Sequence, residues 1–81
     1  MQVKSLIERA SQHVGSQNKL AEALGVKPPK VSNWKTGDLA CPIETQAELC
    51  ELAALPEAEA KDHIWRAVIA LRRAKKAARN S

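Results

Sequence analysis

The sequence predicts an all-α fold, a small domain of five helices. No segment of useful length alternates apolar and polar residues with the period of two that strands require, whereas apolar residues recur with the helical period of 3.6 along the chain. Glycine or proline stands wherever one periodic segment gives way to the next. Because 81 residues are near the lower limit for an independent core, we expect one domain that spans residues 1–81.

The first two helices are predicted at about residues 2–13 and 17–24. One face of the first helix is apolar and comprises Val3, Leu6, Ile7, Ala10 and Val14. Gly15 follows as its C-terminal stop. Ser16 or its neighbour is expected to cap the second helix, and Gly25 to end it. The inward side chains of the second helix are predicted to be Leu20, Ala21 and Leu24.

Two adjacent prolines, Pro28 and Pro29, separate the second helix from the third. Proline is tolerated in the first turn of a helix, where its missing N–H has no intrahelical partner, and it disfavours a helical conformation in the residue before it. The third helix therefore begins near Pro28, at an angle to the second, and ends around Gly37. Val31 and Trp34 are three positions apart and are predicted to point into the core.

The last two helices are each expected to follow a proline, Pro42 and Pro56. The apolar line of the fourth helix is predicted to comprise Ile43, Ala47, Cys50 and Ala54, with Leu49 and Leu52 alongside. The fifth helix is predicted over residues 56–78. Acidic residues in its early turns and basic residues near its end favour both ends of the helix dipole. Its central apolar face comprises Ile64, Trp65, Val68, Ile69 and Leu71.

The charged residues lie in three blocks, although the formal net charge is only +4. Residues 1–37 carry six basic and two acidic side chains, and residues 63–81 carry six basic and no acidic ones. Between them, residues 38–62 carry one basic and seven acidic side chains. A polyanion is therefore expected to engage the first block, the last block or both, and to avoid the middle block.

Motifs for catalysis or cofactor binding are missing from the sequence. There is no glycine-rich phosphate loop, serine elbow or paired metal-ligand motif, so we expect no enzyme activity, no cofactor, no metal and no small-molecule ligand. Glutamates at helical surface spacing are interpreted as a solvated face: Glu44, Glu48 and Glu51. Cys41 and Cys50 are interpreted as small apolar side chains, because with His13 and His63 they lack the spacing of zinc sites.

Apolar runs are too short for a membrane span and no charged N-terminal segment precedes an apolar one, so we expect neither a membrane span nor a signal peptide. We therefore expect a cytoplasmic protein.

Residues 17–37, QNKLAEALGVKPPKVSNWKTG, have the pattern of a helix-turn-helix unit. Such a unit needs a small residue where the second helix crosses the first, a residue that tolerates positive φ in the turn, and apolar residues on the inner face of the second helix. These requirements are met by Ala21, Gly25, Val31 and Trp34, and the buried side is completed by Leu20, Leu24 and Val26.

The segment LAEALGVKPPKVSNWKTG resembles the DNA-reading unit of lambdoid phage repressors, Cro proteins and the wider xenobiotic response element type of regulators. CPIETQAELCELA resembles the helix, begun by a proline, that follows this unit in many Cro-type proteins. The resemblance covers roughly residues 3–54 and departs from the family at Lys27, which replaces the usual polar N-cap of the reading helix. It implies a lambda repressor-like DNA-binding domain and a transcriptional regulator, a phage or prophage repressor or a Cro-like protein.

The same resemblance implies a site on double-stranded DNA. In that family the second helix of the unit enters the major groove and the N-terminus of the preceding helix meets phosphate. The implied base contacts are Lys30 and Asn33, with Lys27, Pro29 and Ser32 nearby, and the implied phosphate contacts are Gln17, Asn18, Lys19 and Lys35. The alternative for each lysine is that it makes no DNA contact and only keeps an exposed helix soluble.

The fifth helix has three possible roles: it closes the core, forms a two-fold dimer contact, or lies on an anionic membrane. The acidic middle block disfavours the membrane. We therefore predict a homodimer that binds a palindromic operator, with an interface formed by Ile64, Trp65, Val68, Ile69 and Leu71. The alternative function is a protein-interaction module, such as the antitoxin of a toxin–antitoxin pair.

Overall fold

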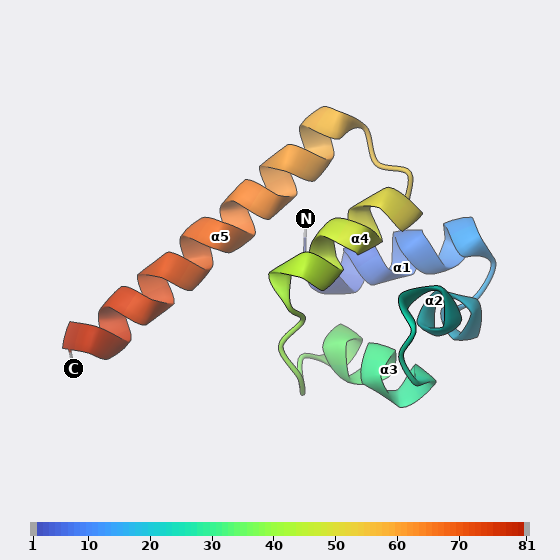
Figure 1. Ribbon diagram of the computed structural model, residues 1–81, viewed down its shortest axis with the longest axis horizontal. Coiled ribbons are helices and arrows are strands. Elements are labelled where there is room, and N and C mark those ends of the chain that lie inside the picture. The colour runs from blue at the N-terminus through green and yellow to red at the C-terminus, as the bar shows by residue number, and fades with distance from the viewer. Residues whose placement is uncertain (1, 81) are drawn as a thin grey trace.

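The computed structural model describes residues 2–80, with side chains described for residues 2–76. All regular structure in this range is helical, which confirms the predicted all-α class (Figure 1). The helices are α1 (Val3–Val14), α2 (Gln17–Leu24), α3 (Pro28–Thr36), α4 (Ile43–Leu52) and α5 (Glu57–Asn80). None of them combines the length and the apolar composition that a bilayer-spanning segment requires.

Helices α1 to α4 form a body around one small core. Helix α1 packs against each of the other three, and α2 packs against α3. The buried apolar side chains are Leu6, Ile7, Ala10, Leu20, Ala21, Val31, Trp34, Leu49 and Cys50. The predicted core position of Trp34 is confirmed, because only 4% of this residue is exposed.

The turns of the body follow from its glycines, its prolines and one serine. Gly25 has a φ of 70°, a left-handed conformation in which a side chain would be strained. The hydroxyl of Ser16 accepts a hydrogen bond from the backbone N–H of Lys19 at 3.1 Å, so the predicted cap of α2 is confirmed. Lys27 precedes α3 in an extended conformation and makes no side-chain cap, and the helix begins at Pro28 as predicted.

The predicted apolar line of α4 is wrong at two positions. Ala47 is exposed, and Ala54 lies beyond the end of α4 with a φ of 53°. The buried side of α4 consists of Gln46, Leu49 and Cys50. The prediction failed because it ranked positions by hydrophobicity and so passed over a buried glutamine.

Gln46 is buried with a hydrogen bond at both the nitrogen and the oxygen of its side-chain amide. Its Nε2 donates to the carbonyl oxygen of Cys41 at 2.9 Å, and its Oε1 lies 2.8 Å from Nε2 of His63. Since the amide N–H₂ faces Cys41, the oxygen accepts, and the His63 nitrogen donates. This buried polar chain joins α4, the segment before it and α5.

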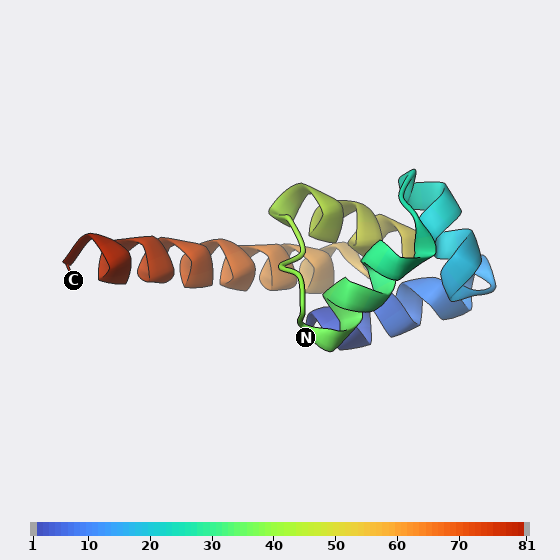
Figure 2. The same ribbon diagram turned by 90° about the horizontal axis from the view of Figure 1, so that it is seen from below.

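Helix α5 packs mainly against α4 and extends well past the body, as Figures 1 and 2 show. Leu55, Ala60 and Ile64 pack against the core, whereas Trp65 is 63% exposed and Leu71 is 46% exposed. A long Arg9–Glu59 ion pair at 3.5 Å also connects the start of α5 to α1. The last helix is therefore attached to the body by its first half.

Candidate nucleic-acid interface

Helix α3 presents a polar face to solvent. The burial of Val31 and Trp34 fixes the rotation of the helix, and it lies along an edge of the body beside α2 (Figure 1). The residues exposed as a result are Lys27, Pro29, Lys30, Ser32 and Asn33. All the side chains implied as base contacts are thus accessible on one short helix and the residue before it.

Lys30 lies against the tryptophan one turn further along α3. Its Nζ is 5.7 Å from the centroid of the Trp34 ring, a cation–π distance. Exposed contacts of this type contribute about 0.5–1 kcal/mol. The Lys30 ammonium group therefore lies along the helix surface. Turning it outward to a hydrogen-bond acceptor would lose only this small contact energy.

The backbone of Asn33 helps to end α3, whereas its side chain is free to bind a ligand. Its carbonyl oxygen accepts hydrogen bonds from the N–H groups of Gly37 and Leu39, each at 3.1 Å, which ends α3. Among the described residues, its side-chain amide has no hydrogen-bond partner, so both the donor and the acceptor remain available. Asp38 follows α3 and lies 2.9 Å from the Thr36 hydroxyl, which places a negative charge at this end of the helix.

The residues implied as phosphate contacts are less uniform. Asn18 and Lys19 are exposed at the start of α2, whereas Gln17 and Lys35 are partly buried. Nζ of Lys35 lies 3.9 Å from the Glu8 carboxylate, so part of its charge is compensated within the protein. Lys19 is therefore a stronger candidate than Lys35 for a phosphate contact.

An open groove of about 600 Å³ brings residues of α1, α2 and α3 together. Its lining residues are Lys4, Glu8, Gln17, Ser32, Lys35 and Thr36. Three of them were implied by the sequence as DNA contacts; Lys4 was not, because only the apolar face of the first helix was interpreted. The signal was present, because Lys4 and Glu8 are four positions apart and fall outside the apolar face.

The sequence profile of the family described as "Bacterial toxin YdaS" matches residues 7–54. This match spans more than half of the chain. The chain belongs to the bacterial toxin YdaS family. The matched range contains all of α2, α3 and α4 and leaves out α5. The match is to the YdaS family and not to a family of repressors or Cro proteins. No curated protein and no solved structure matches the chain.

The two cysteines of this YdaS-family chain are apolar in character. Burial raises the pKa of the Cys41 thiol to about 11 and also raises the pKa of the Cys50 thiol. Both thiols are free, and both are protonated near pH 7. No group of three His, Cys, Asp or Glu side chains suited to a metal ion occurs in the described part of the chain.

Proposed function

We propose that this YdaS-family chain is a sequence-specific, DNA-binding transcriptional regulator. In this proposal it is a phage or prophage repressor or a Cro-like protein that binds a palindromic operator as a homodimer in the cytoplasm. The observation that carries the proposal is the orientation of α3. The helix buries Val31 and Trp34 and leaves its base-contact candidates in solvent, beside an α2 that is joined to it through a left-handed Gly25.

The charge around α3 supports a polyanionic ligand. Lys19, Lys27 and Lys30 are exposed, and none of them forms an ion pair with a described residue. An unpaired surface ammonium group is free to replace a counterion at a DNA phosphate, and this release drives much of protein–DNA affinity. The acidic residues lie mostly on α4 and the start of α5, away from this surface.

The outward side chains of α3 have the chemistry of major-groove readers. Lysine donates to O6 or N7 of guanine, and the asparagine amide pairs with N6 and N7 of adenine. A proline ring packs against the methyl group of thymine, as other apolar groups do. Lys30 and Asn33 are therefore the principal base contacts in this proposal, and Pro29 is a secondary one.

Salt dependence of DNA binding tests the proposal. Fluorescence anisotropy is measured with a duplex from the region upstream of the chain's own gene and with a random duplex of equal length. We expect log affinity to fall linearly with log salt concentration, with a slope of about −0.9 for each phosphate neutralised. An affinity that stays flat between low and moderate salt contradicts DNA as the ligand.

A pair of matched variants localises this effect. Lys19→Ala is expected to reduce the salt slope by about 0.9 per protomer. Arg9→Ala removes one positive charge from α1 at a site that pairs with Glu59 of α5. This control is expected to leave the slope unchanged. Equal reductions by both variants would indicate a response to net charge alone.

The family description favours a second candidate function, a component of a toxin–antitoxin pair that binds a protein. In that case the surface of α4 and α5 would meet the partner, and DNA affinity would be absent or would not depend on sequence. The anisotropy measurement distinguishes the two candidates. Preference for the upstream duplex over the random duplex supports the regulator, and equal weak binding of both supports the protein-binding module.

A further inference from the structure

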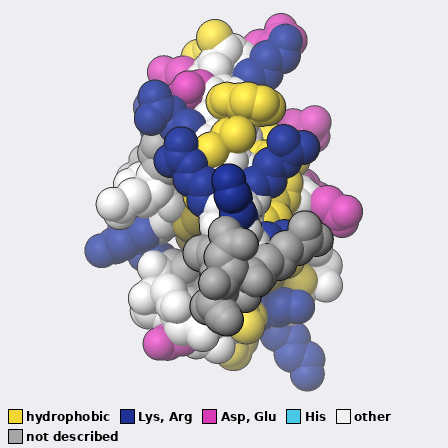
Figure 3. All heavy atoms as spheres, turned by 90° about the vertical axis from the view of Figure 1, so that its left-hand side faces the viewer, with side chains coloured by type: hydrophobic (Ala, Val, Ile, Leu, Met, Phe, Trp, Pro, Cys, Tyr) yellow, Lys and Arg dark blue, Asp and Glu magenta, His cyan; other side chains and the backbone are white. Residues whose placement is uncertain are grey.

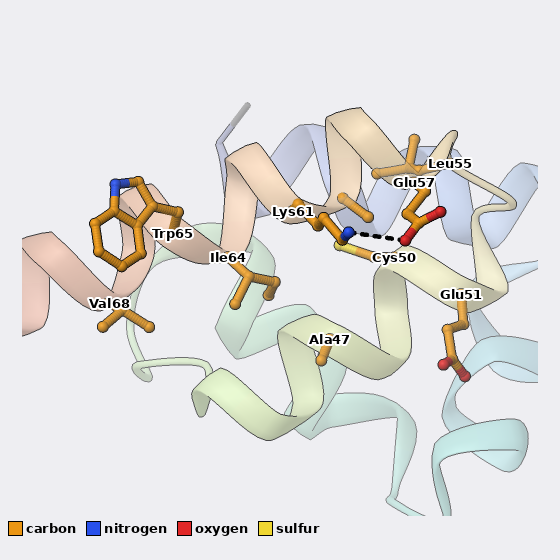
Figure 4. A pocket seen from close by; sticks show the side chains of 10 residues that line it. Ala47, Cys50, Glu51, Leu55, Glu57, Lys61, Ile64, Trp65 and Val68 are labelled. Carbon is orange, nitrogen blue, oxygen red and sulfur yellow. Dashed lines mark ion pairs between the residues drawn. The ribbon is translucent and has the colours of Figure 1, made fainter.

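A groove of about 710 Å³ lies between α4 and the first half of α5. Its floor is apolar and includes Cys50, Leu55 and Ile64. Figure 4 shows that its two ends differ: Glu51 and Glu57 stand at one end, and Val68 and Trp65 at the other. The groove is therefore acidic where α5 begins and apolar where α5 leaves the body.

An apolar stripe runs along α5 from this groove. It comprises Ile64, Trp65, Val68 and Leu71. Ile64 and Val68 are half-buried, while Trp65 and Leu71 are largely exposed. Figure 3 views the molecule from the end of α5 and shows hydrophobic side chains exposed among Lys and Arg side chains. The body covers only part of this stripe: Ile64 packs against the core and Val68 lines the groove beside α4, whereas Trp65 and Leu71 stay largely exposed.

Charged residues continue the same side of α5 beyond both ends of the stripe. An α-helix turns by about 100° per residue, so positions 57, 61, 64, 68, 72 and 75 lie within one broad face. This face begins with Glu57 and Lys61, which form an ion pair at 2.9 Å, and it ends with Arg72 and Lys75. Because Glu51 of α4 lies beside that pair, the first end carries a net negative charge, the middle is apolar and the last end is positive. An antiparallel copy of the same face therefore has the complementary charge at each end.

We propose that the α4–α5 groove binds α5 of a second copy of this chain, with the two helices antiparallel. Glu57 and Lys75 are each nine positions from residue 66, or about 13.5 Å along the helix. A two-fold axis at this level places Glu57 of each copy opposite Lys75 of the other. It also places Ile64 opposite Val68, and it brings Arg72 toward the acidic end of the groove. The inference supplies the dimer that the proposed function requires, but it does not depend on DNA.

The charges favour an antiparallel second copy over a parallel copy and over an anionic lipid surface. A parallel pair of α5 helices would set Arg72 and Lys75 of one copy beside the same residues of the other, and like charges repel at this spacing. An anionic lipid surface would meet Glu51 and Glu57 beside the same stripe. Only the antiparallel copy matches the acidic end, the apolar stripe and the basic end together.

Charge reversal, measured without DNA, tests the pairing. Sedimentation equilibrium gives the dimer dissociation constant of the full chain. We expect Glu57→Lys and Lys75→Glu each to raise this constant roughly tenfold, because each substitution disrupts two symmetric ion pairs and introduces repulsion. In the double variant the charges are exchanged and complementary again, so its constant is expected to return to within about threefold of the original. Val68→Asp is expected to give a monomer.

Matched controls make the same charge changes on the opposite side of α5. Glu59→Lys and Arg73→Glu lie about 200° around the helix from Glu57 and Lys75. We expect each to leave the dissociation constant within about threefold of the original value. Far-UV circular dichroism confirms that every variant keeps its helix content.

Several results would overturn the pairing. They are an unmodified chain that stays monomeric at millimolar concentration, a double variant that fails to recover, or controls as damaging as the test variants. A monomer that sediments with phosphatidylglycerol vesicles would assign the stripe to lipid and also overturn it. A dimer with the expected variant pattern that binds no DNA would leave this inference intact and contradict only the proposed function.

Discussion

The two tryptophans lie in regions of opposite character. Trp34 is 4% exposed in a body whose four helices cover one another, whereas Trp65 is 63% exposed on a helix that packs mainly on α4. Both residues belong to apolar faces with helical spacing. The difference shows that an apolar face holds the monomer together only where another element covers it. On α5 the same chemistry is available for association.

A buried polar pair connects the body to α5; we call this pair, Gln46 and His63, the joint. Gln46 and His63 are 7% and 6% exposed and bond to each other across α4 and α5. A buried hydrogen-bonded pair adds little net stability, but it is costly to leave unpaired. The joint therefore fixes where α5 sits on the body more than it stabilises the body itself.

Truncation of the two tryptophans is the strongest way to test this contrast. Trp34→Ala is expected to lower the free energy of unfolding by about 3–5 kcal/mol, since it removes a buried side chain and leaves a cavity. Trp65→Ala is expected to change it by about 0.5 kcal/mol or less, as for most exposed positions. The measurement is urea unfolding followed by far-UV circular dichroism, at concentrations where the monomer predominates. Similar losses in the two variants would contradict the division into a self-sufficient body and an uncovered helix.

Removal of the polar joint tests how α5 is held. Gln46→Ala is expected to cost about 1–3 kcal/mol, because it leaves His63 and the Cys41 carbonyl without this partner. Hydrogen exchange is expected to accelerate in the first half of α5 more than in α1 to α3. Glu48→Ala, an exposed change on the same helix, is the control and is expected to alter neither quantity. Uniform acceleration across the whole chain would show that the joint stabilises the body directly.

Much of the fold is predictable because its signals are local. Gly25 and Pro28 mark helix ends through their own backbone preferences, and the burial of Val31 and Trp34 follows from helical spacing. Gln46 was not predictable in this way, since its burial depends on His63, which lies 17 positions away. The pairing of Lys35 with Glu8 likewise depends on how α1 and α3 pack. Periodicity identified the apolar stripe of α5 and could not show what covers it.

The contrast between base contacts and phosphate contacts is the most direct test of the claim that α3 reads DNA. Affinities of Lys30→Ala, Asn33→Ala and Lys19→Ala are measured by anisotropy on the preferred duplex, on single base-pair variants of it and on a random duplex. We expect Lys30→Ala and Asn33→Ala each to lose about 1–3 kcal/mol on the preferred duplex and to relax base preference at one position. Lys19→Ala is expected to weaken all duplexes alike. Equal weakening of preferred and random DNA by Asn33→Ala would contradict the account.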